Sequence, residues 1–90
     1  MPEHVIIEIV GKPSYLRWTL EQWVLEVKDI IELEYDVELV VKTVDSDNDL
    51  PVLRIAGSDV FIGLPGEEGY LIEVLKKKLE EIGIKKKELG

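Results

Sequence analysis

Apolar residues recur along this chain with two different spacings, which together predict four strands and two helices. Residues 4–10 and 37–44 are dense in Val and Ile, and both segments are predicted to be strands. Residues 52–56 and 59–64 read as two further strands, and the Gly57-Ser58 pair between them predicts a tight β-hairpin. The predicted order is therefore strand, helix, strand, strand, strand, helix.

Both helices are predicted from apolar residues spaced three and four apart, the pattern of one buried helix face. The first helix ends near Leu33, and two starts fit the pattern, a capping box at Thr19 or an N-cap at Ser14. Its apolar stripe consists of Leu16, Leu20, Trp23, Val24, Val27, Ile30 and Ile31. The second helix covers about 67–82, and its stripe consists of Leu71, Val74, Leu75, Leu79 and Ile82.

The order of these elements limits how the strands can be arranged. A strand–helix–strand unit joins parallel neighbours by a right-handed crossover, and the third and fourth strands must pair antiparallel in their hairpin. Because the first strand is apolar on both faces, it is predicted to be central, which gives the sheet order 2-1-3-4. The connection from Asp45 to Leu50 can reach about 20 Å, and the gap that it must cross is about 9.6 Å. We therefore predict an α/β fold with a mixed four-stranded sheet and two helices, which lie either on one face or on both.

Four motifs follow one another in the order typical of a known superfamily. They are Lys12-Pro13-Ser14-Tyr15-Leu16-Arg17-Trp18, Val44-Asp45-Ser46-Asp47, Leu50-Pro51-Val52-Leu53-Arg54-Ile55-Ala56-Gly57 and Phe61-Ile62-Gly63. The chain resembles the thioredoxin/glutaredoxin superfamily, and most closely its small glutaredoxin-like proteins, over residues 4–82. The resemblance implies a minimal thioredoxin-like fold in which the helix between the second and third strands is absent or reduced. The sheet face that this helix would cover is then expected to be thinner or open.

The positions where this superfamily carries its redox cysteines are occupied here by Tyr15 and Trp18, and the chain has no cysteine. Neither a phenol, whose ordinary pKa is about 10, nor an indole can replace the thiolate of thiol–disulfide exchange. The resemblance also implies that Pro51 is a cis-proline that leaves the preceding backbone free to bind an extended peptide or glutathione. We expect the Leu50–Pro51 bond to be cis, and the alternative is a trans proline that opens a strand.

The leading functional hypothesis is a redox-inactive thioredoxin-like protein that is not an enzyme and that binds a protein or peptide or acts as a structural module. Its predicted binding surface consists of Ser14, Tyr15, Trp18, Leu50 and Pro51. Exposed aromatic side chains beside the proline would indicate such a surface, whereas buried ones would belong to the core.

Two other functions fit the same pattern. Glutathione transferase domains of thioredoxin fold activate a bound thiol with a Ser or Tyr hydroxyl near the end of the first strand, and Ser14 or Tyr15 would have that role here. Such enzymes carry a second, helical domain that ninety residues cannot hold. The third hypothesis is a homodimer formed through strand 37–44, whose apolar faces and predicted edge position favour pairing across a two-fold axis.

Length and charge limit the domain organisation of the chain and the kinds of partner that it can bind. Ninety residues allow a single domain at 1–90, with a core at 4–82 and a basic tail at 83–90. Nineteen acids against eleven bases give a net charge of −8, which repels phosphate backbones, so no nucleic-acid partner is expected. The lysines at 76–78 and 85–87 fit a helix C-terminus followed by a solvated tail, or a docking patch for an acidic partner. No apolar run is long enough for a membrane span and the start lacks a signal peptide, so a cytoplasmic protein is expected.

No cofactor or metal site is expected from the residue types present. The single histidine, His4, has neither a cysteine nor a second histidine to share a transition metal with, and it fits a solvated strand start. The acids of 45–49 alternate as in a calcium loop, but Leu50 and Ala56 stand where an EF-hand needs Gly and Glu. The glycine-rich segment 63–69 lacks the Lys and Ser/Thr of a phosphate loop.

The composition also predicts high thermal stability. One Asn, one Gln, one Met and no Cys, together with 33% charged residues, are typical of thermophile proteins. We therefore expect a thermophilic protein whose melting temperature, measured by circular dichroism, lies above the mesophile range, which ends at about 65 °C. A midpoint within that range would contradict the interpretation.

Overall fold

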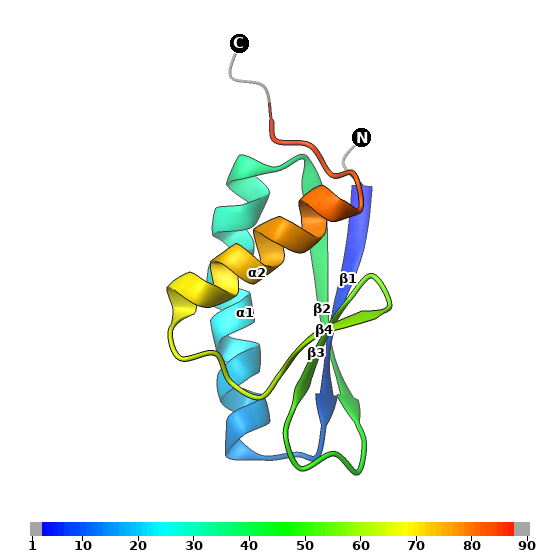
Figure 1. The fold of residues 1–90 in the computed structure, drawn as a ribbon, viewed down its shortest axis with the longest axis vertical. Helices are drawn as coiled ribbons and strands as arrows, with labels where there is room; N and C mark the ends of the chain where they lie inside the picture. Colours follow the sequence, from blue (N-terminus) through cyan, green and yellow to red (C-terminus); the bar gives the residue numbers. More distant parts are fainter. Residues whose placement is uncertain (1–2, 88–90) are drawn as a thin grey trace.

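The computed structural model describes residues 3–87 and confirms the predicted order of elements (Figure 1). The elements are β1 (Glu3–Gly11), α1 (Tyr15–Glu34), β2 (Val37–Asp45), β3 (Val52–Ile55), β4 (Ser58–Ile62) and α2 (Glu68–Glu81). The chain passes from β2 to β3 without a helix, as the length of the connection predicts.

The four strands form one mixed sheet in the predicted order β2-β1-β3-β4. β1 and β2 are parallel over their whole length, with Gly11 opposite Asp45 at one end. β3 pairs antiparallel with β1 only near the carboxyl end of β1, where Val10 lies opposite Val52, and β4 pairs antiparallel with β3. The hairpin turn consists of Ala56 and Gly57, which both have positive φ, so the turn lies one residue earlier than the Gly57-Ser58 pair had predicted.

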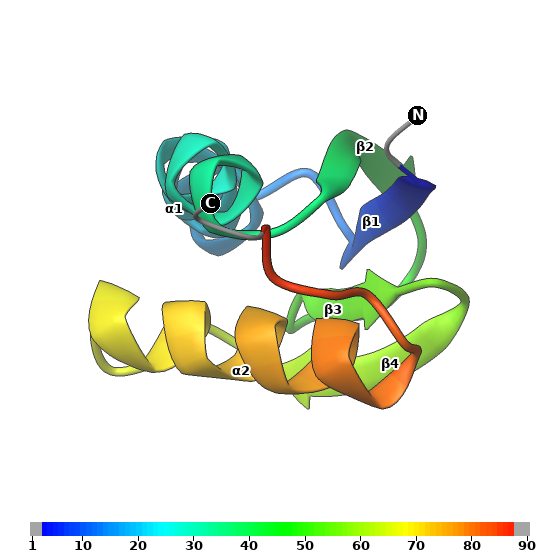
Figure 2. The same ribbon diagram turned by 90° about the horizontal axis from the view of Figure 1, so that it is seen from above.

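Both helices lie on the same face of the sheet (Figures 1 and 2), which settles the alternative left open above. Alternate side chains of β1, β2 and β3 point into this layer, and they form one core with the buried residues of the helices. The sheet contributes Val5, Ile7, Ile9, Val37, Leu39, Leu53 and Ile55, and the helices contribute Leu20, Val24, Val27, Ile31, Leu71, Leu75 and Leu79. Within residues 3–87 no helix lies on the other face, so the expectation of an open face is met.

The start of α1 follows the second of the two predictions. Ser14 is the N-cap, and its hydroxyl oxygen accepts a hydrogen bond from the amide of Arg17 at 3.2 Å. The hydroxyl of Thr19 donates to the carbonyl of Tyr15 instead of forming a capping box. The helix therefore gains one full turn at its N-terminus, and this turn carries Tyr15 and Trp18.

Two residues of the predicted α1 stripe are not core residues. Leu16 is 37% exposed because it lies in the first turn, before the first buried residue of the helix. Ile30 is 48% exposed because successive residues are turned by about 100° around a helix, so burying Ile31 directs Ile30 sideways. Trp23 is half-buried against the core, as expected of a position at the margin of the buried face.

The end of α2 and the segment after it depart from a simple solvated tail. The helix ends at Glu81, Ile82 is its C-cap and is 39% exposed, and Gly83 has φ 91°. The reversal at Gly83 returns Ile84 to the core, where it is 5% exposed. The chain then pairs with the start of β2, since Lys85 accepts a hydrogen bond from the amide of Asp36 at 3.0 Å. The described tail lysines are exposed, as predicted.

None of the helices described is both long and apolar enough to cross a membrane.

The outer edge of β2 is partly closed by a side chain of α1. Glu32 accepts a hydrogen bond from the amide of Leu39 at 2.8 Å and another from Lys28 at 3.0 Å. A carboxylate near a helix C-terminus is normally unfavourable, and here an edge-strand N–H and a lysine offset that cost. Burial of Glu32 by itself would raise its pKa, but these two partners outweigh burial and hold the pKa below its ordinary value of 4.5.

This interaction predicts a specific dependence of stability on pH. A carboxylate whose pKa is lowered by folding stabilises the protein above its unfolded pKa and loses that contribution as the pH falls through its folded pKa. We expect Glu32→Gln to lower the free energy of unfolding by about 1 kcal/mol at pH 7 and to flatten the loss of stability below pH 4.5. Urea unfolding at pH 7 and pH 3 measures both effects, with the exposed Glu73→Gln as the control. Equal pH profiles for wild type and Glu32→Gln would contradict this account.

Candidate functional site

The five residues singled out in the sequence lie at one end of the molecule, the lower end in Figure 1. Ser14, Tyr15 and Trp18 belong to the N-cap and first turn of α1, and Leu50 and Pro51 lead into β3. We call this set the aromatic tip. The carboxyl ends of β1 and β2 reach the same end, because these strands are parallel.

The two aromatic side chains of the tip are exposed and lie against each other. Tyr15 is 77% exposed and Trp18 is 55% exposed, and their rings are stacked with centroids 6.1 Å apart. Leu50, on the other side of the tip, is 49% exposed. Exposed aromatic side chains that lie against each other, as Tyr15 and Trp18 do, are typical of binding surfaces.

The prediction of a cis-proline is wrong, because all described peptide bonds are trans, including the Leu50–Pro51 bond. Trans is the favoured form of an X–Pro bond by about 0.5–1 kcal/mol. A trans proline fits at the start of β3, where a missing N–H donor is tolerated. Pro51 is buried, and its carbonyl accepts a hydrogen bond from the amide of Gly63 at 2.7 Å. Pro51 therefore serves packing, and Leu50 supplies the exposed surface.

The tip is braced by hydrogen bonds between the β1–α1 turn and the β2–β3 connection. The amide of Lys12 donates to the carbonyl of Asn48 at 3.0 Å, and the amide of Ser46 donates to the carbonyl of Gly11 at 3.2 Å. The guanidinium of Arg17 donates to that same carbonyl at 3.0 Å and pairs with Asp45. A surface held in this way loses little conformational entropy when it binds a ligand.

The acids and hydroxyls of the tip already have structural partners. Asp45 pairs with Arg17, and Asp49 pairs with Lys12 at 2.9 Å, so two of the three alternating acids carry counter-ions. No cluster of three or more His, Cys, Asp or Glu suited to a metal occurs within residues 3–87. The hydroxyl oxygen of Ser14 is used in capping α1. His4 lies on β1 away from the tip, with its Nε2 3.1 Å from Glu38.

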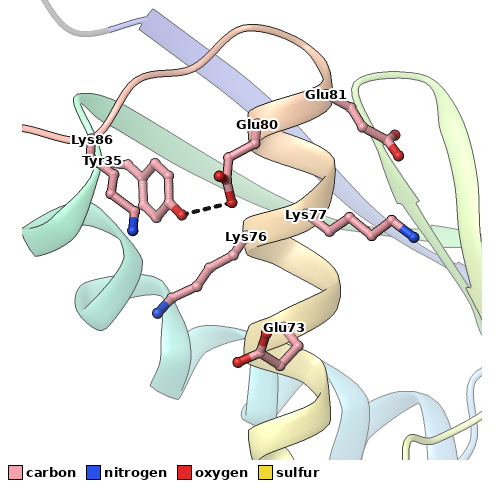
Figure 3. Close-up of a pocket in the computed structure, with 7 residues that line it drawn as sticks. All are labelled: Tyr35, Glu73, Lys76, Lys77, Glu80, Glu81 and Lys86. Atoms are coloured by element: carbon pink, nitrogen blue, oxygen red, sulfur yellow. Dashed lines mark hydrogen bonds between the residues drawn. The ribbon is translucent and has the colours of Figure 1, made fainter.

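A second feature, which the sequence reasoning missed, is an open hollow of about 620 Å³ between α2 and the end of α1 (Figure 3). It is lined by Tyr35, Glu73, Lys76, Lys77, Glu80, Glu81 and Lys86. Tyr35 is fully buried, and its hydroxyl lies 3.2 Å from a carboxylate oxygen of Glu80. Burial disfavours the phenolate and the charge of Glu80 adds to this effect, so the pKa of Tyr35 is raised above its ordinary value of 10.0. The sequence does contain a sign that Tyr35 is buried, because this aromatic residue stands directly between two acids, Glu34 and Asp36.

The groups of this hollow hold the two helices together. Lys76 of α2 pairs with Glu34 of α1 at 3.0 Å, and the phenol of Tyr35 donates to Glu80 of α2. A phenol kept protonated by its surroundings is not available as a base near neutral pH. The hollow therefore serves the packing of α1 on α2, and the aromatic tip is the stronger candidate for a functional site.

Comparison of the chain with protein-family models, with curated proteins and with solved structures gives no match.

The bracing of the tip can be tested at Gly11. A Cβ added there would lie 3.2 Å from the Cα of Pro51 and 3.6 Å from the carbonyl oxygen of Asn48, and both are backbone atoms of the braced connection. We expect Gly11→Ala to lower the free energy of unfolding by about 1–2 kcal/mol, the usual cost of overpacking. Chemical denaturation measures this cost. Gly66→Ala is the matched control, because a Cβ there meets no atom within 4 Å. Equal effects of the two substitutions would show that the tip is looser than described.

Proposed function

We propose that this chain is a redox-inactive, thioredoxin-like module that binds an extended apolar segment of a protein partner through its aromatic tip. The proposal is carried by the stacked pair Tyr15 and Trp18, which stand exposed on a braced end of the fold. The strand order supports it, as does the motif resemblance, which aligns Tyr15 and Trp18 with the redox positions of the superfamily in a chain that has no cysteine.

The chemistry of the tip favours an apolar partner. Two of its three alternating acids are paired internally, Asp45 with Arg17 and Asp49 with Lys12, so most of the charge at this end is neutralised. The large apolar side chains exposed at this end are the stacked rings of Tyr15 and Trp18 and, separately, Leu50. Aromatic side chains of this kind contribute large contact areas at small entropic cost, which suits the recognition of aliphatic or aromatic side chains of a peptide.

Catalysis by the tip has less support. A hydroxyl that activates a thiol needs an oriented base or a charged neighbour, and the oxygen of Ser14 is used in capping α1. The thiol-binding alternative, with Ser14 or Tyr15 as the activating group, remains a prediction and forms one arm of the test.

The test is selection of a random peptide library on the folded protein, followed by titration of the selected peptides into ¹⁵N-labelled protein. We expect apolar or aromatic sequences whose addition shifts the amide resonances of 14–18 and 46–52. The double variant Tyr15→Ser/Trp18→Ser should weaken binding by about tenfold or more, as expected for central aromatic contacts. Leu33→Ser is the matched control, because Leu33 is 79% exposed and lies at the other end of α1.

Three outcomes decide the proposal. Shifts confined to the open face of the sheet or to the hollow beside Tyr35 would overturn it, as would equal losses from the double variant and from Leu33→Ser. A separate titration with glutathione that shifts the resonances of residues 14–18 would favour the thiol-binding function instead.

A further inference from the structure

The open face of the sheet carries its side chains in rows that cross all four strands. One row is apolar and consists of Val44, Val10, Val52 and Ile62, from β2 across to β4. The next row is charged and consists of Lys42, Glu8, Arg54 and Asp59 in the same strand order. Residues paired across neighbouring strands share a face, so each row is continuous from one edge of the sheet to the other. A shorter apolar pair, Ile6 and Val40, follows on the far side of the charged row.

The charged row alternates in sign across the sheet. Read from β2 to β4, it is positive, negative, positive, negative, and it is neutral in total although the chain carries a net charge of −8. Arg54 and Asp59 are paired at 2.7 Å, with side chains 34% and 57% exposed. The net negative charge of the molecule therefore lies outside this row, and the row does not repel its own reversed image.

The apolar rows differ in exposure along their length. Ile62 is 66% exposed and Ile6 is 43% exposed, Val40, Val44 and Val52 are half-buried, and Val10 is 5% exposed. A sheet with one face in water usually alternates apolar residues inward with polar residues outward. Here polar and apolar residues alternate by row on the outward face itself, and exposed apolar side chains such as Ile62 and Ile6 are typical of an interaction surface.

We propose that two copies of this chain pack face to face through the open face, related by a two-fold axis that lies in the interface, parallel to the strands and between β1 and β3. Such an axis reverses the order of each row in the second copy. Lys42 then faces Asp59 of the second copy, and Glu8 faces Arg54 of the second copy. The apolar row meets its own reversed image, with Ile62 against Val44 of the second copy.

The direction of the axis follows from the charges. A two-fold axis across the strands would keep the order of the row and place Lys42 on Lys42 and Glu8 on Glu8. Only the axis along the strands makes all four charged contacts attractive, and it gives the aligned packing that sheets commonly adopt. The axis passes through the centre of the sheet, so all four strands take part.

The alternative dimer pairs two molecules through the edge strand 37–44. Two backbone N–H groups of that edge already have partners within the chain, so they are not open to a second strand. The amide of Leu39 is bonded to Glu32 at 2.8 Å, and the amide of Val37 is bonded to the carbonyl of Tyr35 at 2.9 Å. An incoming strand would have to displace both. The open face needs no such displacement.

Sedimentation velocity over about 1 µM to about 1 mM tests the proposal. We expect the wild type to shift from monomer to dimer as its concentration rises, because a face of four strands makes a small interface and hence a weak dimer. Ile62→Asp changes a side chain that is 66% exposed in the monomer, and it should weaken the dimer by about tenfold or more. Leu33→Asp is the control, since Leu33 is 79% exposed on α1 and should leave the dimer unchanged.

The charged row allows a sharper test. Glu8→Lys alone, and Arg54→Glu alone, each place like charges across the interface twice and should each weaken the dimer by about tenfold or more. In the double variant Glu8→Lys/Arg54→Glu, the lysine introduced at position 8 faces the glutamate introduced at position 54 of the second copy. Opposite charges therefore meet again, and most of the lost affinity should be recovered. Circular dichroism checks that each variant is folded.

A monomer at all concentrations would overturn the proposal. So would a dimer that is unaffected by both Ile62→Asp and Glu8→Lys, which is the result expected for edge pairing through β2. Single charge variants that are not rescued by the double variant, although all are folded, would reject the orientation of the axis. The double variant Tyr15→Ser/Trp18→Ser should leave the dimer intact. A failure of the dimer proposal can therefore be told apart from a failure of the proposed peptide binding.

Discussion

The rest of the structure depends on the pairing of β1 with a neighbour on each side, parallel to β2 and antiparallel to β3. This pairing divides the side chains of β1 into two sets. Val5, Ile7 and Ile9 enter the core under the helices, and their burial holds both helices on one face of the sheet. Ile6, Glu8 and Val10 alternate with them and belong to the open face. The same strand ends at Gly11, where its close approach to Pro51 fixes the position of the tip.

Much of the fold follows from local pattern, because the strands and helices bury faces with clear periodicity. The density of β-branched residues at 4–10 marks a central strand, and the short β2–β3 connection leaves few ways to order the sheet. Three features could not be predicted in this way, since they depend on partners distant in sequence. Glu32 is explained only by Leu39 and Lys28, the burial of Tyr35 only by α2, and the return of Ile84 to the core only by the reversal at Gly83.

The candidate site was predicted in part. The motif comparison located Tyr15, Trp18 and Leu50, and the structure exposes all three at the same end of the molecule. The same comparison failed at Pro51, where the resemblance implies a cis bond that the structure does not have. Motif spacing reports where residues stand along the chain, whereas the conformation of one peptide bond depends on packing around it. The rows of the open face were missed because they appear only when the register of all four strands is known.

The contact between Glu32 and Leu39 has a consequence for how this protein behaves in solution. A bare edge strand offers its N–H groups to any other extended chain, which is a route to aggregation. Here one N–H of that edge, the amide of Leu39, is occupied by the carboxylate of Glu32 on the last turn of α1, so the partial closure of the edge depends on the helix. The docking of α1 on the sheet therefore also limits how many N–H groups of β2 remain open to another extended chain.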